Sequence, residues 1–144
     1  MAKFESVLII DDNANCIAFM SQALESEGGV QVSSEMVPLH AFARIEEEKP
    51  SLVLLDIKMH GLDGFGLLTQ LRNSGNDLPV IMLSGSVRQS DVDRAYALGC
   101  NGYFQKPVSL AAYRALAAAM IAYWRCGELS AAHELPEADR RLVG

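Results

Sequence analysis

The sequence contains few cysteines and no long hydrophobic run. Its three cysteines, Cys16, Cys100 and Cys126, form neither a disulfide framework nor a CxxC metal-binding pair. The N-terminus lacks the basic and then apolar pattern of a signal peptide. The longest apolar run, residues 115–124, is well short of the roughly 20 residues that a membrane-spanning helix needs. These absences favour a reduced, cytoplasmic protein that contacts no membrane.

The sequence also lacks an excess of basic residues. Lysine and arginine number 12 against 18 acidic residues, and the resulting net charge of −6 argues against direct, non-specific nucleic-acid binding. No glycine-rich loop follows the first apolar segment, so a nucleotide site of that kind is not expected. Low-complexity tracts and internal repeats are absent too. At 144 residues, half of them hydrophobic, the chain can build the core of one domain.

Short apolar segments alternate with segments of helical periodicity. The five predicted strands are residues 7–10, 30–37, 52–55, 80–83 and 102–104. Four of these are almost wholly apolar, as in a parallel sheet that is covered on both faces. The predicted helices end near Gly28, Pro50, Gly75, Gly99 and Arg125; Leu39, Phe42 and Ile45 mark the second helix, and Ser109 is the expected N-cap of the fifth. Strict alternation of this kind predicts a doubly wound α/β fold.

Polar residues directly follow four of the predicted strands. Asp11 and Asp12 follow the first, Asp56 the third, Ser84 the fourth and Lys106 the fifth. Ligands of open parallel sheets bind beyond the carboxyl ends of the strands, so we expect these side chains to meet at one edge. If the first and third strands are neighbours, three carboxylates share one small cleft.

Three carboxylates in one cleft raise one another's pKa unless a cation offsets their charge. Oxygen ligands at the mouth of an open cleft suit Mg²⁺, which can then take a phosphate oxygen as its next ligand. Lys106 by charge and Ser84 by a hydrogen bond can hold the remaining phosphoryl oxygens. Asp56, alone on its loop, is the carboxylate best placed to attack phosphorus. The sequence therefore predicts an aspartyl phosphate formed by in-line transfer.

This set of residues resembles the receiver domain of two-component response regulators, including the single-domain chemotaxis type. The resemblance covers residues 5–125 and rests on the acidic pair, on LLDIKMHGLDG around Asp56, on LSG with Ser84 and on GYFQKP with Lys106. It implies a flavodoxin-like, five-stranded parallel sheet of order 2-1-3-4-5 with five helices. It also implies a phosphoacceptor switch rather than an enzyme.

The resemblance implies roles for residues and partners. Asp56 would accept phosphate from a histidine kinase or a phosphotransfer protein, and the switch would act on a downstream effector protein. Asp11 and Asp12 would bind Mg²⁺, one of them through water, with the backbone carbonyl of Lys58 as a further ligand. Tyr103 stands where the family keeps an aromatic switch that turns inward as the serine or threonine hydroxyl is drawn to the phosphate. A plain core aromatic is the alternative for this tyrosine.

The sequence departs from the family pattern near the phosphoacceptor. His60 stands where a proline is frequent, four residues after Asp56, so we expect a less rigid loop there. Lys58 and Ser86 occupy positions that tune the lifetime of the phosphoryl group in relatives. The histidines share no metal-binding spacing, and the cysteines are expected to be inert.

The end of the chain carries the clue to partners. We expect a domain over residues 1–126, and residues 127–144 turn polar, as in a tail or the start of a linker. One stripe of the last helix can pack on the sheet, and it comprises Leu110, Ala117, Ile121 and Trp124. A second apolar stripe comprises Ala112, Leu116, Ala119 and Tyr123. The second stripe predicts a homodimer or partner contact, unless the tail folds back over it.

Three alternatives remain for the function. The chain could be the N-terminal receiver of a larger regulator with an output domain, or a binding module that acts without phosphorylation. A metal-dependent phosphatase would also use an aspartate nucleophile with Mg²⁺. Such hydrolases usually carry a second carboxylate two residues after the nucleophile, where this chain has Lys58 after Asp56 and Asn13 after Asp11. The phosphatase is therefore disfavoured.

Overall fold

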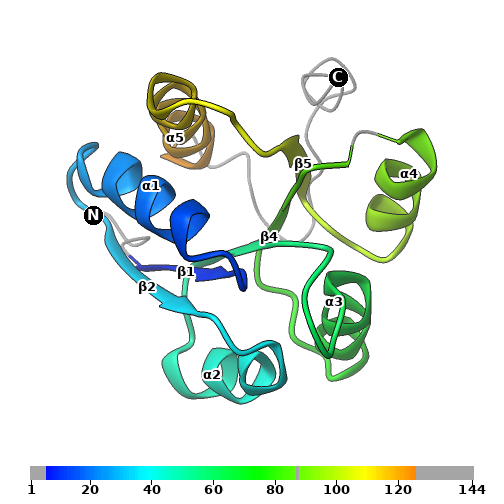
Figure 1. Cartoon of the computed structure of the whole chain (residues 1–144). Helices are drawn as coiled ribbons and strands as arrows, with labels where there is room; N and C mark the ends of the chain where they lie inside the picture. The colour runs from blue at the N-terminus through cyan, green and yellow to red at the C-terminus, as the bar shows by residue number, and fades with distance from the viewer. Residues whose placement is uncertain (1–5, 87, 126–144) are drawn as a thin grey trace.

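The computed structural model describes residues 6–86 and 88–125 of the 144-residue chain. Five strands alternate there with five α-helices (Figure 1). The strands are β1 (Ser6–Ile10), β2 (Gln31–Glu35), β3 (Leu52–Leu55), β4 (Val80–Ser84) and β5 (Gly102–Gln105). The helices are α1 (Ala14–Glu25), α2 (Ala41–Glu48), α3 (Gly64–Asn73), α4 (Gln89–Ala97) and α5 (Leu110–Arg125), and a 3-10 turn, η1 (Pro38–His40), precedes α2. The predicted alternation is confirmed.

The five strands form one parallel sheet in the order β2-β1-β3-β4-β5. Helices α1 and α5 cover one face of this sheet, and α2, α3 and α4 cover the other (Figure 1). The chain moves outward from β1 to β2 and then returns past β1 to β3, so the strand order reverses at β1. The predicted doubly wound, flavodoxin-like fold is confirmed, and it places β1 and β3 side by side.

The central strands are apolar along their length because helices cover both faces of the sheet. Every residue of β3 and β4 is buried, whereas the edge strand β2 is only partly buried. Helices α1 and α3 add Met20, Leu24 and Leu68 to the same core. Full burial of a side chain of this size stabilises the fold by about 1.5–3 kcal/mol. The strands thus form a rigid platform for the loops at their carboxyl ends.

Side-chain caps fix the start of two helices beside these loops. The Asn13 side-chain oxygen accepts hydrogen bonds from the backbone N–H groups of Asn15 and Cys16, at 2.9 and 3.1 Å. The Asp63 carboxylate accepts one from the Gly66 N–H at 2.8 Å. Such caps satisfy N–H groups that have no partner inside the helix. The loops after β1 and β3 are therefore held at both ends.

The second helix begins later than its apolar residues predict. Leu39, predicted to be part of this helix, lies in η1 instead, and its side chain is 71% exposed. Pro38 fixes its own backbone at the first position of a tight 3-10 turn, and this turn points Leu39 to solvent. Ile45 is buried as expected, and Phe42 packs against the core.

The last helix buries a face that differs in part from the predicted stripe. Its buried residues are Tyr113, Ala117, Met120 and Ile121. Leu110 and Trp124, which were expected on this face, are only half-buried. Ser109 caps the helix as predicted, since its hydroxyl accepts a hydrogen bond from the Ala112 N–H at 3.1 Å.

The described helices include none that is both long and apolar enough to cross a lipid bilayer. The predicted tail, residues 127–144, lies outside the described residues, as do Cys126 and His133. The domain boundary at residue 126 stays a prediction.

Candidate functional site

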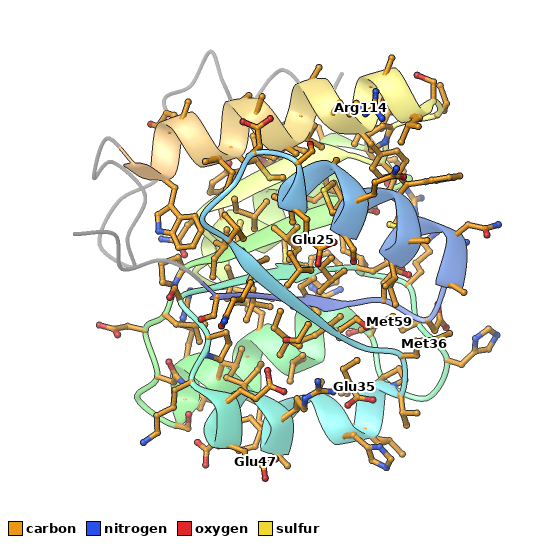
Figure 2. All side chains as sticks on the ribbon, turned by 90° about the vertical axis from the view of Figure 1, so that its left-hand side faces the viewer. Glu25, Glu35, Met36, Glu47, Met59 and Arg114 are labelled. Carbon is orange, nitrogen blue, oxygen red and sulfur yellow. The ribbon has the colours of Figure 1, made fainter. Side chains whose placement is uncertain are left out.

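The carboxyl ends of β1 and β3 bring three carboxylates together. Asp11 and Asp12 follow β1, Asp56 follows β3, and one oxygen of each lies within 4.8 Å of the others. Asp11 and Asp56 are buried, with exposed fractions of 2% and 5%, whereas Asp12 is partly exposed at the mouth of the cluster. Figure 2 shows Met36 and Met59, which follow β2 and β3, at this same end of the sheet. The cleft predicted from strand adjacency is present.

Lys106 reaches into this cluster from the loop after β5. Its Nζ lies 2.9 Å from Asp11 Oδ2 and 3.3 Å from Asp56 Oδ2. The Lys106 N–H donates to the Ser84 carbonyl at 2.7 Å, which fixes the lysine backbone beside the end of β4. Burial lowers the pKa of Lys106, but the hydrogen bond and charge of Asp11, with the charge of Asp56, outweigh burial and leave that pKa raised. Lys106 is therefore a fixed cation between two buried carboxylates.

The lysine offsets only part of the negative charge. Burial, followed by the negative charge of Asp11, raises the pKa of Asp56 to about 6, although Lys106 opposes the shift. Ionised Asp56 is thus held in an environment that still favours its protonated form. A hard cation bound by the carboxylate oxygens would lower the free-energy cost of ionising Asp56, so the donor set fits Mg²⁺.

Ser84 and Tyr103 meet at the loop after β4. Ser84 is the last residue of β4, it is buried, and its hydroxyl accepts a hydrogen bond from the Ser86 N–H at 3.0 Å. The Tyr103 side chain is fully buried, and its hydroxyl donates to the Ser86 carbonyl at 3.0 Å. Burial is the main cause that raises the pKa of Tyr103. Both side chains therefore contact one short segment, which continues through the Ser86 hydroxyl to Asp91 at 2.6 Å.

His60 is a contact that the sequence did not predict. Its backbone N–H and its ring Nδ1 lie 2.9 and 2.7 Å from the same oxygen of Asp12. The backbone hydrogen bond from His60 is the main cause that lowers the pKa of Asp12. The loop after β3 is therefore fastened to Asp12, whereas we expected a less rigid loop. One signal was available in the sequence: a residue other than proline at position 60 has an N–H to donate.

Cys16 and Tyr113 form a second unpredicted contact behind the cluster. The Cys16 thiol interacts with the Tyr113 hydroxyl and with Asp11, and burial is the main cause that raises its pKa to about 12. The Tyr113 ring packs against Phe19, with 5.6 Å between ring centroids. Cys16 and Cys100 are both buried and take part in no disulfide, and the high pKa of Cys16 fits the expectation that it is unreactive. The inner wall of the site is thus built by α1 and α5.

The remaining predicted site residue is Lys58. Its side chain is exposed on the loop after β3, between Asp56 and His60. The proposed use of its backbone carbonyl as a metal ligand stays a prediction.

This fold, with an acidic cluster, a lysine and a serine at the carboxyl edge of the sheet, defines a receiver-type domain. The chain belongs to the response regulator receiver domain family, whose sequence profile matches residues 7–118. Among curated relatives, the heme response regulator HssR of Staphylococcus haemolyticus is 37% identical over 100 residues, 69% of this chain and 44% of HssR. The transcriptional regulatory protein PrrA of Mycobacterium leprae is 36% identical over 107 residues, 73% of this chain and 45% of PrrA. The chain thus spans less than half the length of these two relatives.

Solved structures agree with the family assignment. The receiver domain of the Francisella response regulator 1452 superposes with a TM-score of 0.71 at 25% identity, covering 85% of this chain and 98% of that one. The response regulator domain of CheB from Thermotoga maritima gives a TM-score of 0.75 at 24% identity, covering 86% and 96%. The second likeness concerns the fold alone.

Proposed function

We propose that the chain is a phosphorylation-controlled switch in which Asp56 accepts a phosphoryl group in the presence of Mg²⁺. The observation that carries this proposal is the contact of Lys106 Nζ with both Asp11 and Asp56, at 2.9 and 3.3 Å, inside a cluster of three carboxylates. A buried aspartate with a cation on one side and a metal-binding pair on the other has the parts that phosphoryl transfer needs.

The cation would be held by Asp11, Asp12, Asp56 and the backbone carbonyl of Lys58. Bound Mg²⁺ would offset the carboxylate charges and orient a phosphoryl oxygen. Asp11 is fixed for this role from two sides, since its Oδ1 accepts a hydrogen bond from the Asn13 N–H at 2.9 Å and its Oδ2 contacts Lys106. Such a fixed ligand costs little reorganisation when the cation arrives.

In the proposed reaction, an ionised oxygen of Asp56 attacks phosphorus in line with the bond to the donor. That bond breaks, its electron pair leaves with the donor atom, and an acyl phosphate remains on Asp56. Lys106 neutralises charge on the phosphoryl oxygens, and the Ser84 O–H donates a hydrogen bond to one of them. The access of water to the Asp56 carboxylate is restricted, because this residue is only 5% exposed.

The proposed output begins at Ser84. If its hydroxyl moves to the phosphoryl group, the loop segment at Ser86 follows, since the Ser86 N–H is bonded to that hydroxyl. Tyr103 is attached to the same segment through the Ser86 carbonyl, so a shift there reaches β5. A few kcal/mol of new contacts suffice to move such a two-state equilibrium by decades.

The proposed partners are a histidine kinase or phosphotransfer protein and a downstream effector protein. A second copy of the chain is a further candidate. Ala112, Leu116 and Ala119 of α5 line a groove of about 420 Å³ together with Phe104 and the loop after β5. This groove contains most of the second apolar stripe, and Val108, which also lines it, is 98% exposed. Molar mass by light scattering with and without beryllofluoride tests the dimer, and an unchanged monomer mass contradicts it.

The receiver of a longer regulator is the second candidate function. It is favoured by the curated relatives, which are about twice as long as the region they share with this chain and include a named transcriptional regulatory protein. In that case the same groove would contact an output domain. If Asp56 cannot be phosphorylated, the remaining candidate is a binding module that acts without phosphorylation.

Intact mass spectrometry after incubation with acetyl phosphate or phosphoramidate tests the main proposal. The wild type should gain about 80 Da in Mg²⁺ and nothing in EDTA, and Asp56→Asn should gain nothing. Because the acyl phosphate is labile, a titration with beryllofluoride, followed by amide NMR spectra, runs beside it. No added mass and no beryllofluoride response would exclude the switch and leave a phosphorylation-independent binding module.

A further inference from the structure

His60 occupies one oxygen of Asp12 with two donors. The backbone N–H lies 2.9 Å and the ring Nδ1 2.7 Å from Asp12 Oδ2. A carboxylate oxygen has two lone pairs, so these two groups fill the hydrogen-bonding capacity of that atom. A proline at this position would supply neither the backbone N–H nor the imidazole.

Each carboxylate of the cluster has a protein side chain as a partner. Asp11 and Asp56 share Lys106, and Asp12 has His60. The two partners differ in burial: the Lys106 side chain is 20% exposed, whereas the His60 side chain is fully exposed. The lysine is thus a built-in part of the cleft, and the imidazole reaches Asp12 from the solvent side.

We propose that His60 competes with the divalent cation for Asp12 and thereby sets the metal affinity of this site. A cation and a hydrogen-bond donor need the same lone pairs, so a cation bound at Oδ2 displaces the imidazole. This inference rests on the proposed function, because the cation is the one that serves phosphoryl transfer at Asp56. Since the ring is solvent-exposed, its displacement costs little, and His60 weakens binding without blocking it.

Metal binding is coupled to the loop after β3 by the same contact. The imidazole fastens residue 60 to the end of β1, and that loop also contains Lys58, whose carbonyl is the proposed further ligand. When the imidazole leaves Asp12, the loop loses one of its two links to this carboxylate and keeps the backbone link. The cation would therefore take a ligand from the loop after β3 and also weaken the attachment of that loop to Asp12.

Isothermal titration with Mg²⁺ tests the competition directly. Measurements at about pH 8, where a free imidazole is neutral, keep protonation constant across the proteins compared. The expected result is a Kd for Mg²⁺ that falls by about two- to tenfold in His60→Ala, the range for loss of one exposed hydrogen bond. His60→Pro also removes the backbone donor, so its Kd for Mg²⁺ should fall at least as far. Equal or weaker binding by His60→Ala overturns the inference.

His40→Ala is the matched control. His40 is also an exposed histidine near a carboxylate, with Nδ1 3.9 Å from Glu35 Oε2, but it does not contact Asp12. Its removal should leave the Kd unchanged. A change as large as that of His60→Ala would point to general surface charge and overturn the inference.

NMR of the imidazole rings supplies a second readout that does not depend on phosphorylation. Saturation with Mg²⁺ should move the ring resonances of His60 toward those of a free histidine and leave those of His40 in place. If Mg²⁺ binds and Asp56 is modified but the His60 resonances do not move, the competition is overturned and the proposed function stands. If neither the wild type nor His60→Ala binds Mg²⁺, the proposed function fails together with this inference.

Discussion

Gly64 packs directly against the peptide group of Asp56. The Gly64 N–H donates to the Ile57 carbonyl at 2.7 Å, and a Cβ at position 64 would overlap the carbonyl oxygen of Asp56. The loop after β3 ends at this contact, where α3 begins. The position of Asp56 therefore depends on the absence of a side chain at residue 64.

Gly64→Ala is expected to destabilise the protein by about 2 kcal/mol, because the added methyl group meets backbone that cannot move aside cheaply. It should also slow phosphorylation, since the displaced peptide belongs to Asp56. Gly66→Ala is the matched control: its Cβ would meet the end of the Leu62 side chain at 3.3 Å. Urea unfolding of both variants measures the difference, and equal stabilities would contradict the prediction.

Asp56→Asn is expected to stabilise the metal-free protein at high pH and not at low pH. The pKa of Asp56 is about 6 in the folded state against an ordinary value of 3.8, so the folded state favours the protonated carboxyl. That stability is fully present below about pH 3.8 and is lost as the pH rises through about 6. Residue 56 of the variant does not titrate. As the pH rises over this window, the free energy of unfolding of the variant should therefore increase relative to that of the wild type, by about 1–3 kcal/mol above pH 7.

Urea unfolding in EDTA at several pH values between about 4 and 8 measures this gain. Added Mg²⁺ should narrow the gap, because a cation offsets the cost of ionised Asp56 in the wild type alone. A difference between variant and wild type that does not depend on pH would contradict the prediction.

Arg72→Met is expected to destabilise the fold by about 2–4 kcal/mol and leave the site unaffected. The guanidinium donates to the Gly99 carbonyl twice, at 3.0 and 2.8 Å, and to the carbonyls of Asn76 and Leu78, at 3.0 and 2.9 Å. Loss of these donors leaves partly buried carbonyls without them. Arg72→Lys should recover only part of the loss, because an ammonium cannot reproduce the fork. Thermal unfolding measures the loss of stability, and the Kd for Mg²⁺ shows whether the site is unaffected.

Lys58→Ala is expected to change the decay rate of the phosphorylated protein by about two- to tenfold, the effect of about 0.5–1.5 kcal/mol at the barrier. The exposed ammonium stands two residues from Asp56, where it can order or exclude the attacking water. Arg114, an exposed cation on α5, is the control position (Figure 2). The decay of the added mass with time measures the rate, and an unchanged curve removes the role of Lys58.

The apolar runs were sufficient to predict the strands because both faces of the sheet are covered. The edge strand fits less well: residues 30–37 were predicted, and β2 covers Gln31–Glu35. Leu39 was misplaced because helical periodicity does not reveal a 3-10 turn, whose different pitch rotates the side chain outward. On α5, spacing alone offered two apolar stripes, and packing against α1 selected a face with Tyr113 instead of Leu110.

The positions of Asp11, Asp56, Ser84 and Lys106 could be predicted because each lies at or just after the end of a strand. The strand order then determines which of these ends are neighbours. The His60 contact could not, since it depends on the path of a loop that has no regular structure. The contact between Cys16 and Tyr113 depends on how α1 packs against α5, which no local pattern specifies. Strand ends thus fix the positions of the acidic cluster and Lys106, whereas loops and helix contacts determine the interactions around them.

The two buried carboxylates and the lysine that they share are widely separated along the chain. Asp11 and Asp56 are synthesised before Lys106, which belongs to the loop after β5. A growing chain that has formed only β1 to β4 would bury two like charges with no lysine to offset them, which is costly. Closure of the sheet by β5 therefore completes the fold and the electrostatic balance in one step. Under the proposed function, a nascent chain would offer no complete acceptor site to a phosphodonor until β5 has docked.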